Sequence, residues 1–191
     1  TIEFWQKTAF NPIEIFSEDF RVIAIDQRNA GRSSGPITDG NPWDDYLADH
    51  IGLLNHLGIA NCHILGCCIG SSYALNLVKA IPGRIASAVL EQPVGLDEAN
   101  SEIMPNAWRA WSEEMLNKQP ELDMKTLENF GKRMWGSDFV LSVTREDVAA
   151  CTTPLLVLPG IDVFHPTEIG HEIARLAPNA EIVEPWKEPA D

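Results

Sequence analysis

The feature that most constrains this chain is a run of five residues, Gly66-Cys67-Cys68-Ile69-Gly70. A short apolar run precedes it at residues 62–65, and an apolar stretch with helical character follows at residues 71–80. Glycine has no Cβ atom, so it permits tight turns and close approach of neighbouring backbone. The pattern therefore predicts a buried strand, a sharp turn at Cys68 and a helix.

Further along the chain, short apolar runs alternate with helical patterns. Strands are expected at residues 21–26, 62–65, 88–90, 153–158 and 180–184. Helical spacing of leucine and isoleucine follows Asp44, a candidate N-cap, and Pro166 opens another expected helix. Alternation of this kind, with short connections, is typical of a parallel sheet. We expect an α/β fold over residues 1–191, a single domain with a mostly parallel sheet covered by helices on both faces.

Residues 94–150 interrupt this alternation. They are rich in Trp, Met, Asn and charged residues, and two helices are expected there, at 106–118 and 123–135. We interpret the stretch as a small helical cap inserted over the carboxyl edge of the sheet. Trp108, Trp111 and Trp135 are candidates for lining an apolar substrate pocket. Ordinary packing of the insertion onto the sheet is the alternative for each of them.

Composition excludes several classes of function. The chain has 191 residues, and 14 basic against 28 acidic side chains give it a net charge of −14. Nucleic acids and anionic membranes are bound by clustered Lys and Arg, so neither is an expected partner. No apolar run is long enough for a membrane span. A small-molecule substrate is the remaining expectation.

The four cysteines show neither a disulfide framework nor the CxxC pairs of a zinc site. Free thiols are usual in a reducing cytoplasm, which is the expected location. We expect no metal and no cofactor.

Three motifs, in this order, resemble the α/β-hydrolase superfamily. They are Asp26-x-Arg28-x-x-Gly31-x-Ser33, the Gly66–Gly70 run as a nucleophile elbow, and Pro159-Gly160-x-Asp162-x-x-His165-Pro166 after an apolar strand. Two residues depart from the family pattern: Asn29 stands where glycine is usual, and Cys68 stands where serine is usual. The resemblance covers most of the chain and implies the α/β-hydrolase fold.

The resemblance also implies roles for particular residues. Cys68 is the candidate nucleophile, and its position before a helix N-terminus is expected to lower the thiol pKa. A buried structural cysteine is the alternative. The Ile69 N–H is a candidate oxyanion donor. Asp162 is the candidate acid, with a turn-capping role as its alternative, and Glu91 is a weaker candidate. Cys67 is expected to be structural.

The family places its catalytic histidine in the loop after the last matched strand. Here that loop begins at residues 185–191, and none of the five histidines lies in it. His165 is an alternative base. His50, His56 and His171 are expected to be surface or packing residues, and His63 is expected to be structural. We expect the missing histidine beyond residue 191 and a further strand before Thr1. That strand would lie between those at 21–26 and 62–65, and a gap there favours self-association.

Two principal hypotheses follow. The first is a hydrolase that acts on a small, fairly apolar ester, thioester or lactone through Cys68. The second is a non-catalytic protein with the same scaffold that binds a ligand or a partner. A redox-sensing pair of Cys67 and Cys68 is a third and weaker hypothesis.

Overall fold

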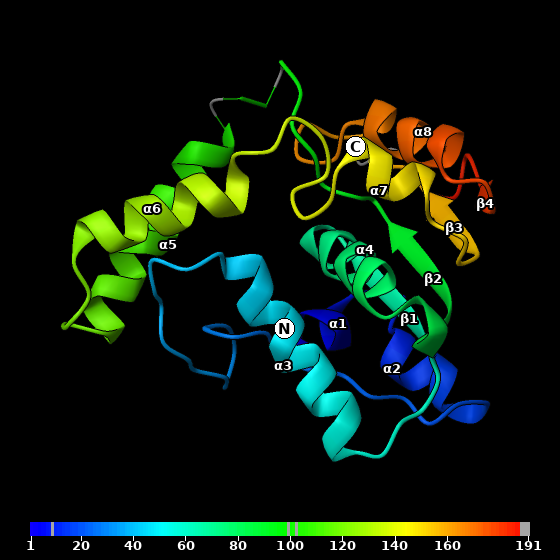
Figure 1. The fold of residues 1–191 in the computed structure, drawn as a ribbon, viewed down its shortest axis with the longest axis horizontal. Helices are drawn as coiled ribbons and strands as arrows, with labels where there is room; N and C mark the ends of the chain where they lie inside the picture. Colours follow the sequence, from blue (N-terminus) through cyan, green and yellow to red (C-terminus); the bar gives the residue numbers. More distant parts are fainter. Residues whose placement is uncertain (9, 99, 102, 188–191) are drawn as a thin grey trace. The chain divides into compact units, whose positions relative to one another are not determined.

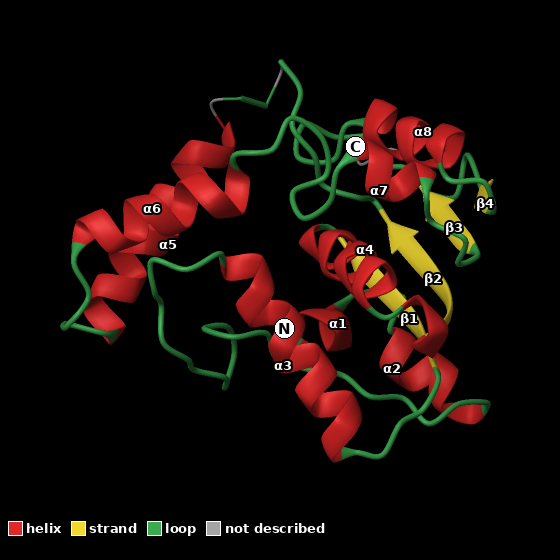
Figure 2. Ribbon diagram, viewed as in Figure 1, coloured by secondary structure: helices red, strands yellow, loops and turns green. Residues whose placement is uncertain are grey.

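The computed structural model describes residues 1–8, 10–98, 100–101 and 103–187, and its chain divides into two compact units, residues 1–36 and 37–191. The second unit contains a four-stranded parallel sheet in the order β1-β2-β3-β4 (Figures 1 and 2). The strands are β1 (Cys62–Cys67), β2 (Ile85–Glu91), β3 (Leu155–Leu158) and β4 (Ala180–Ile182). The predicted fold class, a parallel sheet flanked by helices, is confirmed.

The helices of the second unit agree with most of the predictions. They are α3 (Pro42–His56), α4 (Ile69–Ala80), α5 (Ile103–Lys118), α6 (Met124–Trp135), α7 (Arg145–Ala149) and α8 (Thr167–Leu176), with a 3₁₀ turn, η2, at Pro82–Arg84. Among the described residues, no helix combines the length and the apolar character needed to cross a membrane.

Two details of these helices differ from the expectations. The N-cap of α3 is Asn41 and not Asp44, because the Asn41 side chain accepts the Trp43 N–H and Pro42 occupies the first turn. Helix α7 was not expected. Its signal is a capping box, in which the Thr144 hydroxyl accepts the Asp147 N–H and the Asp147 carboxylate accepts the Thr144 N–H.

The first unit contains α1 (Ile2–Lys7), α2 (Pro12–Ile15) and a 3₁₀ turn, η1, at Phe16–Glu18. The prediction of a strand at residues 21–26 is wrong, because these residues belong to no strand. An apolar run becomes a strand only when a neighbouring strand supplies ladder hydrogen bonds. None of the sheet pairings among the described residues includes this segment.

The carboxylate of Asp26 holds the loop that follows residues 21–26. Asp26 accepts backbone hydrogen bonds from Ile2 (2.8 Å) and Arg32 (3.1 Å). Asn29 has a φ of 61°, a left-handed conformation that asparagine tolerates, and its side-chain oxygen accepts the Gly35 N–H at 3.0 Å. This geometry explains how Asn29 replaces the glycine that is usual in the family.

Two buried apolar clusters meet along α4, which lies against β1 and β2 (Figure 1). Eight consecutive residues of α4 are buried, 71–78. The first cluster lies between α4, the sheet, α7 and α8, and includes Leu75, Leu90, Val157 and Ile173. The second lies between α3, α4, α5 and α6. Its largest members are Trp43, Tyr46, Tyr73, Met115, Leu127, Phe130 and Met134. Burial on several sides fixes the position of α4, and with it the turn at Cys68, the residue just before the helix.

Strand β1 and helix α4 approach each other closely at Gly66. A Cβ atom placed there would lie 2.2 Å from the carbonyl oxygen of Gly70, and the Ser71 hydroxyl also donates to the Gly66 carbonyl at 2.8 Å. A Cβ atom at Gly70 would meet no atom within 4 Å. Of the two glycines in the motif, Gly66 is therefore the one required by close packing.

We expect Gly66→Ala to destabilise the protein by about 3 kcal/mol, since backbone must move to admit the methyl group. Gly70→Ala is the matched control and should be neutral or slightly stabilising, because alanine favours a helix over glycine. Urea unfolding of the two variants measures the difference. Equal stabilities would contradict the close contact.

Candidate active site

The turn at Cys68 has the expected strand–turn–helix geometry. Cys68 alone separates β1 from α4, and its backbone has φ 57° and ψ −124°. The Cys68 N–H donates to the Glu91 carbonyl at 2.9 Å, and its carbonyl accepts the Ser71 N–H at 3.0 Å. Such a conformation costs a non-glycine residue about 1–3 kcal/mol, and residues of this kind cluster at active sites.

Loops from three strands reach the same edge of the sheet. Cys67 is in register with Glu91, and Glu91 is in register with Leu158, so the carboxyl ends of β1, β2 and β3 are level. Cys68, Gln92 and the loop that carries Asp162 continue directly from those ends. In open parallel sheets, ligands bind at this edge.

The environment of Cys68 disfavours its thiolate. Burial raises the thiol pKa, the hydrogen bond from the Ile69 N–H opposes that rise, and the negative charge of Asp162 adds to it. The expectation that the helix N-terminus lowers this pKa is therefore wrong, because loss of hydration is the larger effect. The loop that carries Asp162 continues from the end of β3, which is level with the end of β1 before Cys68.

Asp162 is bonded to its own loop. Its carboxylate lies 2.8 Å from Nδ1 of His165 and accepts the Phe164 N–H at 2.9 Å. Burial raises the pKa of this carboxyl, but the contacts with His165 and Phe164 outweigh that effect, so the net pKa shift is downward. Asp162 is therefore held in its charged form beside an imidazole.

A polar chain next to the turn was not anticipated from the sequence. The Gln92 amide donates to Cys67 Sγ at 3.5 Å, and the Lys187 ammonium donates to the Gln92 carbonyl oxygen. The Trp186 indole N–H donates to the Pro159 carbonyl at 2.6 Å. Lys187 belongs to the loop in which the family carries its histidine, and it lies at this edge of the sheet. Residues 188–191 of that loop lie outside the described part of the chain. The position of Gln92 directly after a strand was the available signal.

Cys67 and Glu91 both have raised pKa values in this setting. Burial first, and then the charge of Glu91, raise the pKa of the Cys67 thiol to about 12. Burial also raises the pKa of Glu91, opposed by its contact with Cys67 and the charge of Lys187. These properties suit Cys67 as a structural thiol.

The three candidate tryptophans border the second apolar cluster, as do Cys68 and Ile69. Trp111 stacks on Phe130, with ring centroids 5.2 Å apart. Helices α5 and α6, which carry the tryptophans, lie side by side (Figure 1). The structure thus brings the turn and the tryptophans to one apolar environment.

Trp108 shows a further feature. Its ring lies over Gly131, where a Cβ atom would be 2.4 Å from the indole. Its buried Nε1 has no hydrogen-bond partner in the described part of the chain. The Trp108 ring therefore packs closely against α6 at Gly131.

The remaining histidines lie elsewhere. His50 is buried against Tyr73, and burial lowers the pKa of its imidazole. His63 contacts the Ser87 hydroxyl at 2.8 Å, and His171 contacts Glu184 at 2.6 Å. His56 is exposed near the end of α3. His50, His56 and His171 thus occupy the packing and surface positions expected of them, and His63 lies in β1 with its ring exposed and bonded to the next strand.

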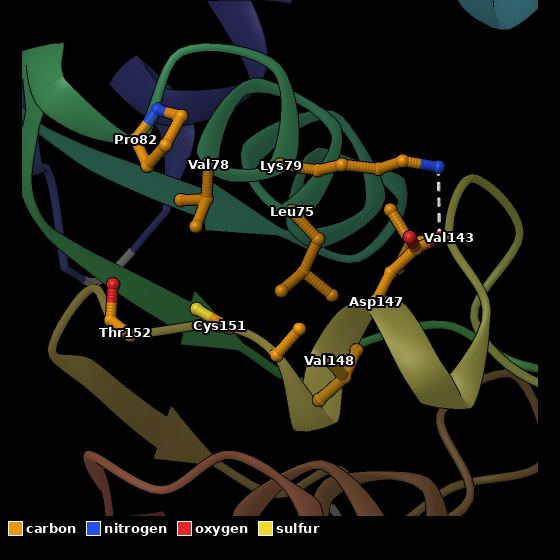
Figure 3. Close-up of a pocket in the computed structure, with 10 residues that line it drawn as sticks. Leu75, Val78, Lys79, Pro82, Val143, Asp147, Val148, Cys151 and Thr152 are labelled. Carbon is orange, nitrogen blue, oxygen red and sulfur yellow. Dashed lines mark hydrogen bonds and ion pairs between the residues drawn. The ribbon is translucent and has the colours of Figure 1, made fainter.

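A cavity of about 280 Å³ lies between α4 and α7 (Figure 3). Leu75, Val78, Val148 and Cys151 are among its lining residues, and an ion pair joins Lys79 to Asp147 at 2.8 Å. None of the predicted site residues lines it. The α4 residues that do so come from the second half of the helix, whereas Cys68 precedes its first residue.

Comparison with known proteins agrees with this fold. Residues 4–149 match the sequence model of the family described as "alpha/beta hydrolase fold". This match covers well over half of the chain, which therefore belongs to the α/β-hydrolase family.

Individual relatives match to different extents. A protein of Pantoea ananatis named "Putative carbamate hydrolase RutD" is 33% identical over 87 residues, which are 46% of this chain and 30% of that relative. A 2-hydroxy-6-oxononadienedioate/2-hydroxy-6-oxononatrienedioate hydrolase of Burkholderia vietnamiensis is 25% identical over 85% of this chain and 67% of its own length. The structure of a hydrolase from Oleispira antarctica superposes with a TM-score of 0.70 at 18% identity, covering 95% of this chain and 77% of that one.

We expect Cys67 to resist alkylation at pH 8, because a thiol with a pKa of about 12 is about 0.01% thiolate there. Iodoacetamide labelling followed by peptide mass spectrometry measures the rate, with a short unstructured cysteine peptide as the reference. Labelling of Cys67 as fast as the reference peptide would show that the thiol is not buried in this way, and would favour a redox-active pair.

Proposed function

We propose that this protein is a hydrolase that attacks the carbonyl carbon of a small, fairly apolar ester, thioester or lactone with the sulfur of Cys68. The observation that carries the proposal is the backbone of Cys68, a non-glycine residue at φ 57° between a buried strand and a buried helix. Family membership supports hydrolase chemistry at this turn.

The residues around Cys68 fit the steps of acyl transfer. The thiol gives up its proton, the sulfur attacks the carbonyl carbon, and the carbonyl oxygen gains negative charge. Ile69 directly follows the nucleophile, so its backbone N–H is the donor that we assign to this oxygen. The same N–H opposes the rise in the pKa of the Cys68 thiol. The charged carboxylate of Asp162 suits the orientation of an imidazole and the stabilisation of its protonated form.

We assign residues 94–150 the role of a cap that selects the substrate. The Leu96 N–H donates to the Phe139 carbonyl at 3.2 Å, so the chain leaves and returns at adjacent points with α5 and α6 between them. Trp108, Trp111 and Trp135 on these helices supply the apolar wall of the acyl pocket.

All four cysteines are free thiols, which supports a reducing compartment such as the cytoplasm.

The second candidate is a non-catalytic member of the family that binds a small apolar ligand at the same edge. The raised pKa of the Cys68 thiol favours it, because a neutral thiol is a weak nucleophile. The two functions differ in whether the bound carbonyl compound is cleaved.

We expect Cys68→Ala to reduce the hydrolysis of p-nitrophenyl acetate at least 100-fold, because the sulfur forms the acyl intermediate. Cys67→Ala is the matched control and should keep activity within about threefold. Release of p-nitrophenol measures the rate. Full activity in Cys68→Ala would exclude Cys68 as the nucleophile, and binding of the ester without cleavage by the unaltered protein would favour the second candidate.

We expect Trp111→Ala to raise KM for p-nitrophenyl butyrate about tenfold, equivalent to about 1.4 kcal/mol, since the longer acyl chain loses an aromatic contact. KM for the acetate should change less. Met124→Ala, at an exposed position on α6, is the control for any effect on KM of a substitution in the α5–α6 pair that leaves the tryptophans in place. Equal changes in KM for both esters would assign Trp111 to packing alone.

A further inference from the structure

The conformation of the loop after β3 fixes the ring of His165. Asp162 and His165 form an isolated antiparallel bridge, and the Asp162 carboxylate oxygens lie 2.8 and 3.0 Å from Nδ1 of His165. A Cβ atom at Gly160 would lie 2.2 Å from the His165 Cβ, so a glycine is required where the two residues meet. The imidazole is thus held by a charged acid and by close packing.

The other ring nitrogen of His165 is in an unusual state. Nε2 is buried and has no hydrogen-bond partner among the described residues. When Nδ1 carries the proton and donates it to the carboxylate, Nε2 has the free lone pair. This tautomer is the form of histidine that accepts a proton, and its orientation by a carboxylate matches the acid–base pairing of hydrolase active sites.

The Cys68 thiol requires a neighbouring group that accepts its proton. Its burial and the nearby Asp162 charge hold its pKa above the ordinary thiol value, so the helix N-terminus alone does not produce a thiolate at neutral pH. Cys68 follows β1 and the loop of Asp162 and His165 follows β3, and the carboxyl ends of these strands are level across β2. The Asp162 carboxylate in that loop bonds to His165 at 2.8 Å.

We propose that His165, oriented by Asp162, is the general base that removes the Cys68 proton. The base then comes from the loop after β3, three residues beyond the acid, and not from the loop after the last strand. This inference rests on the proposed function of Cys68 as nucleophile, and it adds the residue that makes the thiol reactive.

The proton passes between named atoms in each half of the reaction. Nε2 of His165 takes the proton as Cys68 Sγ bonds to the carbonyl carbon, and the carbonyl π pair moves onto the oxygen. Collapse of this adduct breaks the bond to the alcohol or thiol, which leaves with the proton from Nε2. A water then attacks the acyl thioester and gives its proton to Nε2, and Sγ leaves and is reprotonated.

Alkylation of Cys68 by iodoacetamide tests the base without requiring turnover. At pH 7.5 we expect His165→Gln and His165→Ala to be labelled at Cys68 at least tenfold more slowly than the unaltered chain, and 50 mM imidazole to restore part of the rate in His165→Ala. His56→Gln, an exposed histidine of α3, is the matched control and should match the unaltered chain. Labelling of Cys62 and Cys151 in the same samples reports any general loosening of the fold.

The outcomes separate the base from the nucleophile. Equal labelling of Cys68 in His165→Gln and the unaltered chain overturns the role of His165, as does a loss in His165→Ala that imidazole leaves unchanged while Cys62 and Cys151 label as before. Ester hydrolysis that persists in Cys68→Ala overturns the proposed nucleophile. Slow hydrolysis in both His165 variants, with KM unchanged and kcat reduced at least 100-fold, supports both roles.

Discussion

The close approach of β1 to α4 at Gly66 is the contact on which the rest of the site depends. With no side chain at this position, the strand and the helix pack backbone to backbone, and the single residue between them adopts φ 57°. Burial of α4 between two apolar clusters prevents the helix from moving to relieve that conformation. The side chain of Cys68 is therefore presented at the carboxyl edge of the sheet, beside Asp162.

The two adjacent thiols, Cys67 and Cys68, have different electrostatic surroundings at this edge of the sheet. Both are disfavoured as thiolates by burial, but their neighbours differ. Cys67 lies against Glu91 and the Gln92 amide, whereas Cys68 borders the aromatic cluster and senses the charge of Asp162. A buried thiol beside a carboxylate becomes reactive only with a proton acceptor. For this reason the Asp162–His165 pair, whose Nε2 has no partner in the part of the chain that the structure describes, is central to the chemistry that we propose.

Much of the fold could be predicted from local sequence patterns. The β1–α4 turn, the strands at 155–158 and 180–182, and the helices of residues 103–135 follow from apolar periodicity and from glycine and proline positions. The prediction failed at residues 21–26, where the same apolar pattern takes part in none of the strand pairings among the described residues. A short apolar run specifies extended backbone, but only a partner strand makes it part of a sheet. Pairing between distant segments is not encoded in the run itself.

The family, the order of the motifs and the sharp turn at Cys68 could be read from the sequence, because these depend on residues adjacent in the chain. Only the tertiary structure decided how reactive that thiol is. Burial raises its pKa where a helix N-terminus alone would lower it, and burial depends on how α3, α5 and α6 cover the turn. Asp162 and His165 are neighbours in one loop, but only the packing around that loop buried Nε2 of His165 with no partner among the described residues.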